Sequence, residues 1–323
     1  MTRKQLLLLA LKLAVSGLLL WLVLTRVDIA GIAIRLRAAD ARWLIPVLVL
    51  GMLGVPLSAW RWKLLSCGLL SFGESVRYTW IGVFFGSVMP GVVGGDVAKG
   101  LSLAAKKAGA RDSRLPMSII VDKLIGFWIL MLGFSVVATV LLIVQPNLLA
   151  GMRATLWTTC GATLAGLLAA TSICHPRSAS WIASLAARLP TEKLRSAVGR
   201  LLAAFDTYRG QGKVLLQAAL LSILIHSLNA VSFWLVMRSL AIPASLFFAA
   251  VFYPLLTCLL ALPVSVSGVG VRDVFAASMF TAFCLNPESG VAFSWLLLGL
   301  TVPNALIGGA IQLWEIFRRR SAD

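Results

Sequence analysis

The chain has 323 residues, of which 59% are hydrophobic and only 13% are charged, and its mean hydropathy is +0.93. Soluble domains carry about 25% charged residues, so this composition excludes a soluble globular protein and most classes of cytosolic enzyme. The formal net charge of +17 would suggest nucleic-acid binding in a soluble chain, but here the basic residues lie between long apolar runs. The positive-inside rule and attraction to anionic lipids explain them better, and no nucleic-acid partner is expected.

Crossing about 30 Å of hydrocarbon takes about 20 apolar residues in a helix. Charge-poor runs of about that length occur at 6–24, 43–60, 124–144, 154–173, 214–237 and 291–313. A further run, 244–262, ends at Pro263, and the runs 76–89 and 274–284 are too short to span alone. We therefore expect an all-α integral membrane protein with about eight transmembrane helices, forming one polytopic domain over residues 1–323.

The distribution of Lys and Arg predicts the orientation of the chain in the membrane. With the N-terminus in the cytoplasm, the basic groups at 61–114 and 177–213 also fall on the cytoplasmic side, so both termini are expected there. The long polar connection 175–213 places apolar residues at helical spacing among basic ones, which indicates cytoplasmic amphipathic helices on the membrane surface. Tryptophans near the ends of runs, such as Trp62, are expected in the interfacial belts.

Two places interrupt the hydrophobic pattern with Pro and Gly instead of a polar loop, and they predict re-entrant segments at about 72–96 and 263–284. A non-helical backbone at membrane depth must be buried in protein or line a wet cavity, so these segments are the first candidates for a substrate site. Their shared Pro and Gly spacing is a weak sign of an inverted repeat. The candidate residues in them are Gly94, Gly95, Asp96, Ser267, Gly268, Gly270, Arg272 and Asp273.

A half-helix that begins after each interruption would direct its unpaired N–H groups and positive dipole end at a phosphate or another anion. Arg272, in the first turn of the second half-helix, would add a forked donor that suits phosphate oxygens. Purely structural roles are the alternative: Asp96 would serve as a helix cap, and Arg272 with Asp273 would form an ion pair.

Four more polar residues are candidates within or beside other runs. Asp122 and Lys123 precede the run 124–144, where they are either site residues or ordinary boundary charges. His226 and Asn229 lie one helical turn apart, where they line a polar path or make a helix-to-helix hydrogen bond. The five cysteines have no metal-binding spacing, and no nucleophile–base pair is recognisable, so neither a cofactor nor an enzymatic activity is expected.

Several of these motifs occur together in one known family. They are WRWK at 60–63, MPG at 89–91 followed by GGD at 94–96, the pair Asp122–Lys123, and SGVGVRD at 267–273. In this order they resemble the lysylphosphatidylglycerol synthase transmembrane-region family, also called flippase-like domain proteins, over nearly the whole chain. The family usually has Glu-Arg where this chain has Asp122–Lys123, and Arg-Glu where it has Arg272–Asp273.

The resemblance implies a helical bundle with two re-entrant segments, related to the part of those synthases associated with moving lipid between leaflets. Full synthases also carry a cytoplasmic aminoacyl-transferase domain, whereas this chain ends at Asp323, so aminoacylation of phosphatidylglycerol is not expected. Stand-alone members occur in the context of glycolipid, hopanoid and cell-envelope synthesis.

The sequence therefore predicts a lipid translocase of the bacterial inner membrane, with an anionic phospholipid or a polyprenyl-phosphate-linked glycolipid as its substrate. The headgroup would cross through a cavity between the two re-entrant segments. In the empty site Asp96, Asp122 and Asp273 would pair with Lys123 and Arg272. The alternatives are an ion-coupled transporter of a small solute, a lipid-modifying enzyme with Asp96 or Asp122 as general base, and a membrane partner subunit of an envelope-synthesis enzyme. Self-association into a homo-oligomer is left open.

Overall fold

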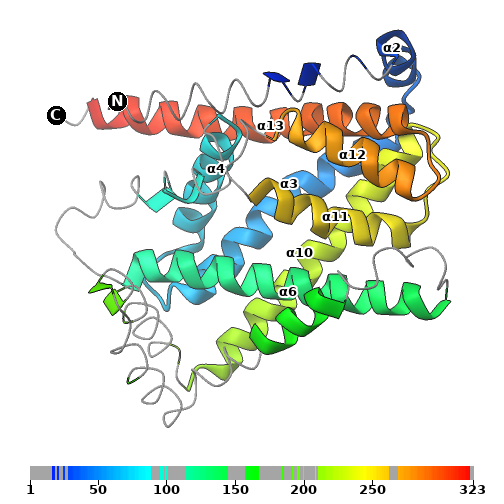
Figure 1. Ribbon diagram of the computed structural model, residues 1–323. Helices are drawn as coiled ribbons and strands as arrows, with labels where there is room; N and C mark the ends of the chain where they lie inside the picture. Colours follow the sequence, from blue (N-terminus) through cyan, green and yellow to red (C-terminus); the bar gives the residue numbers. More distant parts are fainter. Residues whose placement is uncertain are drawn as a thin grey trace. The chain divides into compact units, whose positions relative to one another are not determined.

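The computed structural model describes residues 17–18, 20–21, 25, 28–88, 95–97, 99–100, 114–144, 157–166, 184, 191–192, 195–196, 199, 208, 210–261 and 268–320. Helices and turns make up these residues, and none of them lies in a strand (Figure 1). The prediction of an all-α protein is therefore confirmed. The helices whose two ends are both described are α2 (Ile29–Arg37), α3 (Ala41–Leu65), α4 (Phe72–Val88), α6 (Arg114–Val144), α10 (Gly212–Ser239), α11 (Leu246–Ala261), α12 (Val271–Ala282) and α13 (Pro287–Arg320).

Helices long and apolar enough to cross a membrane are α3, α10, the stretch Leu115–Val144 of α6 and the stretch Pro287–Arg318 of α13. They contain the predicted runs 43–60, 124–144, 214–237 and 291–313, and α11 is a shorter apolar helix. Most of the predicted run 6–24, half of the run 154–173 and most of the connection 175–213 fall outside the described residues. The total of about eight spans therefore stays a prediction.

Short polar side chains explain where several helices begin. Ser71 and Glu74 form a capping box at the start of α4, with Ser71 Oγ accepting from the Glu74 amide (3.2 Å) and Glu74 Oε2 accepting from the Ser71 amide (3.0 Å). Asp28 Oδ1 accepts from the Ala30 amide at the start of α2 (2.9 Å). Because of its capping box, α4 begins at Phe72, where the predicted segment 72–96 begins and four residues before the apolar run at 76.

The helix α6 begins earlier than the sequence indicates. Its first residue is Arg114, so Asp122 and Lys123 lie within the helix and do not mark its start. The carboxylate of Asp122 is buried and paired, whereas Lys123 is exposed. The helix therefore continues through Asp122 and Lys123, because the buried carboxylate of Asp122 has an ionic partner.

Two compact units make up the chain. The first combines Met1–Pro56, Val76–Lys106 and Ser227–Asp323, and the second combines Leu57–Ser75 and Lys107–His226. In the first unit α12 packs beside α13 and α11 (Figure 1), and α2 packs against α13. The rings of Phe248 and Phe252 contact one another and Phe280 between these helices. In the second unit a small buried cluster gathers Leu65, Val121, Tyr208 and Ala218.

Within the first unit, α13 approaches α4 closely at Gly308, where an added methyl group would overlap the backbone oxygen of Trp80. We expect Gly308→Ala to lower the free energy of unfolding by about 1–3 kcal/mol because two helix backbones would have to separate. The exposed Gly299 of the same helix has no atom within 4 Å of such a methyl group. Gly299→Ala should therefore be neutral or slightly stabilising, and denaturant titration of both variants in detergent tests the difference. Equal effects of the two substitutions would contradict the close approach.

Candidate functional site

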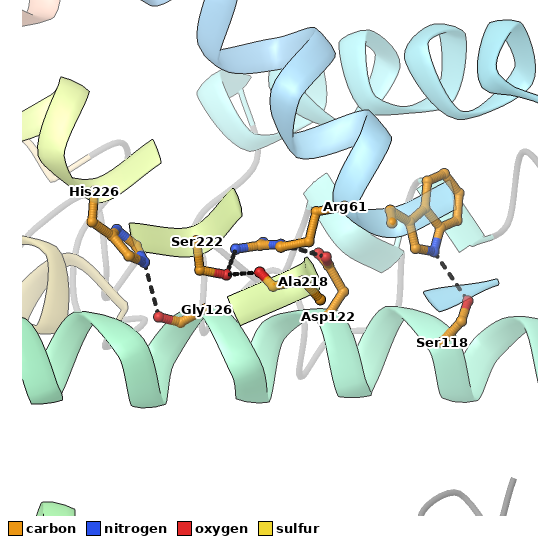
Figure 2. A network of polar contacts seen from close by, with 8 residues as sticks. Arg61, Ser118, Asp122, Gly126, Ala218, Ser222 and His226 are labelled. Carbon is orange, nitrogen blue, oxygen red and sulfur yellow. Dashed lines mark hydrogen bonds and ion pairs between the residues drawn. The ribbon is translucent and has the colours of Figure 1, made fainter. Parts of the chain in front are cut away.

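A buried ion pair lies in the second unit, where Arg61 near the end of α3 meets Asp122 of α6 (Figure 2). Arg61 Nε donates to Asp122 Oδ1 (2.7 Å), and Arg61 Nη2 donates to Asp122 Oδ2 (3.2 Å). Arg61 Nη1 donates to Ser222 Oγ of α10 (2.9 Å), and Ser222 in turn donates to the backbone oxygen of Ala218 (2.8 Å). Each guanidinium nitrogen of Arg61 thus has a partner, so this cluster holds three helix segments together with its charges compensated.

Two further hydrogen bonds join the same segments (Figure 2). Trp62 Nε1 donates to Ser118 Oγ (3.0 Å), and His226 Nε2 donates to the backbone oxygen of Gly126 (2.9 Å). Trp62 is fully buried, so its predicted place in an interfacial belt is wrong: its N–H finds a partner inside the unit. For His226 the structure shows the helix-to-helix hydrogen bond, which was one of the two interpretations of the sequence.

The phenol of Tyr208 is buried in the same unit and donates to the backbone oxygen of Leu65 at the end of α3. Burial raises the pKa of Tyr208, with smaller contributions from Cys67 and Asp122. The folded chain therefore keeps this proton at pH values where the unfolded chain loses it, so the stabilisation is complete below a pH of about 10 and declines above it.

We expect Tyr208→Phe to cost about 1 kcal/mol at neutral pH, because one hydrogen bond is lost. The variant should also lose less stability than the parent when the pH rises from 9 to 11. Thermal midpoints measured across that interval test both expectations, and parallel declines in parent and variant would contradict the second.

A second buried polar cluster lies in the first unit, at the start of α12. Arg272 Nε donates to Ser294 Oγ of α13 (2.7 Å), and Ser294 Oγ donates to Asp273 Oδ1 (2.5 Å). Asp273 Oδ2 accepts from the amide of Gly270, the residue that precedes the helix (3.0 Å). Arg272 is 4% exposed and Asp273 is 1% exposed. Ser294 therefore lies between the two charges, which differs from the direct pairing that the sequence suggests.

The guanidinium of Arg272 is not fully satisfied. Its Nη2 atom is buried and has no hydrogen-bond partner among the residues that the structure describes. Gly268 and Gly270 have positive φ angles of 76° and 80°, and α12 starts directly after them with Arg272 as its second residue. The prediction that a helix begins after the second interruption, with Arg272 in its first turn, is confirmed. An orphaned donor at a helix N-terminus is a favourable place for an anion.

The first interrupted segment is described only in part. Gly95 is helical and buried, and an added methyl group there would overlap the backbone oxygen of Gly82 in α4. This close approach requires glycine. Asp96 is half-buried, and Lys99 is 5% exposed. Gly94 and Ser267 lie outside the described residues, and the cavity expected between the two segments therefore stays a prediction.

The remaining candidates are dispersed. Asp122 is paired with Arg61 and not with Lys123 or Arg272, while Lys123 is exposed and Asn229 is half-buried. Sequence reasoning placed Arg61 among the cytoplasmic loop charges, and it missed Ser222 and Ser294 as partners of arginine. An arginine directly between two tryptophans was the available signal for Arg61, since a loop charge has no need of such neighbours. The described part of the chain contains no group of three or more metal-ligating side chains.

The chain matches the model of a known family. The model of the lysylphosphatidylglycerol synthase TM region matches residues 9–308 and therefore includes both polar clusters and both interrupted segments. Comparisons with curated proteins and with solved structures found no match.

Proposed function

Because the chain belongs to the lysylphosphatidylglycerol synthase transmembrane-region family, we propose that it is a lipid translocase. In this proposal it moves the phosphate-bearing headgroup of an anionic phospholipid, or of a polyprenyl-phosphate-linked glycolipid, between the leaflets of a bacterial inner membrane. Both termini lie in the cytoplasm, and no covalent bond of the lipid is made or broken.

The observation that carries the proposal is the buried Nη2 atom of Arg272, which has no partner among the described residues. Taking a charged headgroup into hydrocarbon is costly unless fixed donors replace its water. The unsatisfied N–H of Arg272 and the amide groups of the first turn of α12 are such donors, and they come from a single short segment. A phosphate oxygen bound there would satisfy the orphaned nitrogen.

Asp273 and Ser294 act as positioning residues in this proposal. Asp273 holds the Gly270 amide and the Ser294 hydroxyl, and Ser294 holds Arg272 Nε, so the side of the guanidinium that carries Nε is fixed. The nearby carboxylate also compensates the charge of Arg272 while no headgroup is bound. The segment around Gly95 and Asp96 belongs to the same unit and would form the opposite wall of the passage.

The experiment is leaflet exchange of fluorescent phosphatidylglycerol and of a fluorescent polyprenyl-phosphate lipid in liposomes that contain the purified chain. We expect Arg272→Gln to slow exchange about tenfold to a hundredfold, since it removes charge-assisted hydrogen bonds of about 1.5–3 kcal/mol. Arg272→Lys should recover only part of the rate, because lysine lacks the forked donor. Arg318 is exposed, so Arg318→Gln is the matched control, and this variant should exchange lipid at the parental rate.

Unchanged exchange in a folded Arg272→Gln variant would remove the site assignment. Absence of exchange in the parent for both lipids would remove the translocase proposal itself. Inhibition of exchange by millimolar inorganic phosphate or by soluble glycerol phosphate would instead favour a transporter of small solutes.

A further inference from the structure

A second arginine site lies in the first unit, at the end of α10. The Arg238 guanidinium carbon lies 5.7 Å from the ring centre of Trp43 in α3 and 5.8 Å from that of Trp234 in α10. The two indole rings meet edge to face, with their centres 6.2 Å apart. Two aromatic rings therefore hold one exposed cation by cation–π attraction.

A backbone hydrogen bond joins the turn between α2 and α3 to the end of α10, beside Arg238. The amide of Asp40 donates to the backbone oxygen of Ser239 (2.9 Å), the residue that follows Arg238. Asp40 Oδ1 accepts from the amide of Arg42 (2.9 Å), which precedes Trp43. The last turn of α2, directly before this turn, adds Arg35 and Arg37. Four arginines and the carboxylate of Asp40 thus lie close along the ends of α2, α3 and α10, so the local charge is positive.

The cation–π contacts with Trp43 and Trp234 leave the N–H groups of Arg238 able to donate hydrogen bonds. A guanidinium directs its N–H groups outward in its own plane, so contact with a ring does not use up these donors. No carboxylate forms an ion pair with Arg238 within the described ranges of the chain. The half-buried Arg77 differs from Arg238: it lies 5.5 Å from the Trp314 ring centre but is already paired with Glu315 (3.3 Å).

The surroundings of Arg238 favour a lipid over a soluble anion. Trp43 and Trp234 stand near the ends of α3 and α10, both of which are long and apolar enough to span a membrane. Tryptophan and arginine at such helix ends lie at headgroup level. Exposed apolar side chains lie near Trp43 in the sequence: Ile45 of α3 is 62% exposed, and Ile34 of α2 is 66% exposed. A ligand that combines a phosphate with acyl chains would contact both kinds of side chain.

We propose that Arg238, with Trp43 and Trp234, binds the phosphate of an anionic phospholipid of the surrounding bilayer as a surface lipid site. Arg42 and the last turn of α2 supply additional positive charge. The inference goes beyond the proposed function, because the site would bind a resident lipid whether or not any lipid crosses the membrane.

Native mass spectrometry of the detergent-solubilised chain, titrated with phosphatidylglycerol or phosphatidylcholine, tests the proposal. The parent should bind phosphatidylglycerol in preference to phosphatidylcholine. We expect Arg238→Gln to weaken phosphatidylglycerol binding about tenfold, the effect of losing one charge-assisted hydrogen bond with its phosphate. Arg238→Lys should lose part of the affinity because lysine lacks the forked donor, and Trp43→Leu should also weaken binding because it removes one cation–π contact.

Arg318→Gln is the matched control, since this exposed arginine lies over the Trp314 ring, 5.3 Å from its centre, whereas Arg238 lies near two tryptophan rings. It should retain parental affinity. Equal losses in Arg238→Gln and Arg318→Gln would overturn the proposal, because they would indicate a general effect of net charge. Displacement of the lipid by millimolar inorganic phosphate would overturn it in favour of a soluble-anion site.

The same variants separate this inference from the proposed function. Arg272→Gln should keep the phosphatidylglycerol bound at Arg238 while it loses leaflet exchange. Retention of binding in a folded Arg238→Gln variant would overturn the surface site and leave the exchange result unaffected.

Discussion

Replacing Arg61 by alanine should destabilise the chain by about 3–5 kcal/mol, because the substitution leaves a buried carboxylate without its ionic partner. Asp122 is only 5% exposed and receives two hydrogen bonds from Arg61, so water cannot take over the role of the guanidinium. The Ser222 hydroxyl would lose its donor as well. Denaturant titration in detergent micelles measures the change in the free energy of unfolding.

The double substitution Arg61→Met with Asp122→Leu is the informative control. Removing both charges together abolishes the desolvation cost, so most of the lost stability should return. Ser222→Ala should cost only about 1 kcal/mol, since Asp122 continues to hold Arg61. A loss below about 1 kcal/mol in the single variant Arg61→Ala would show that the pair contributes little, as surface ion pairs do.

The apolar helices were predictable because each depends mainly on its own sequence. A run of about 20 uncharged residues has few alternatives to a helix once water is excluded, since every backbone N–H and C=O must be satisfied locally. The runs 43–60, 214–237 and 291–313 therefore appear within α3, α10 and α13. Helix ends were less predictable where a charge has a distant partner. The helix α6 continues through Asp122 because Arg61, far away in the sequence, compensates it.

The candidate site was only partly accessible to sequence reasoning. Arg272 stood out because it lies between two apolar runs and close to Pro263 and two glycines, a local pattern. Ser294 could not be found in this way, since a single serine in an apolar helix is common and its role depends on the packing of α12 against α13. Arg61 was misplaced in a loop for the same reason: the hydropathy window ends at Trp60, and only the fold shows that α3 continues to Leu65.

Replacing Asp273 by alanine should also cost about 3–5 kcal/mol, since Arg272 would keep its buried charge and lose the nearby carboxylate. The Gly270 amide and the Ser294 hydroxyl would lose their acceptor at the same time. Hydrogen–deuterium exchange should show faster exchange at the first turn of α12, because the carboxylate caps that helix. Asp273→Asn keeps one acceptor oxygen and should have a smaller effect. Equal stability of parent and Asp273→Ala would contradict the compensation of Arg272.

The two polar clusters use the same three residue types and differ in one respect that decides what each can do. In the second unit all three nitrogens of Arg61 are occupied by Asp122 and Ser222, so the cluster is complete without a ligand. In the first unit Ser294 takes only Nε of Arg272, and the buried Nη2 is left for another acceptor. Removing the arginine and aspartate charges of each cluster together therefore separates a role in stability from a role in lipid exchange. Arg61→Met with Asp122→Leu should restore stability and lipid exchange together, whereas Arg272→Leu with Asp273→Asn should restore stability alone. Parental exchange in a folded Arg272→Leu, Asp273→Asn chain would show that the orphaned nitrogen has no part in moving the headgroup.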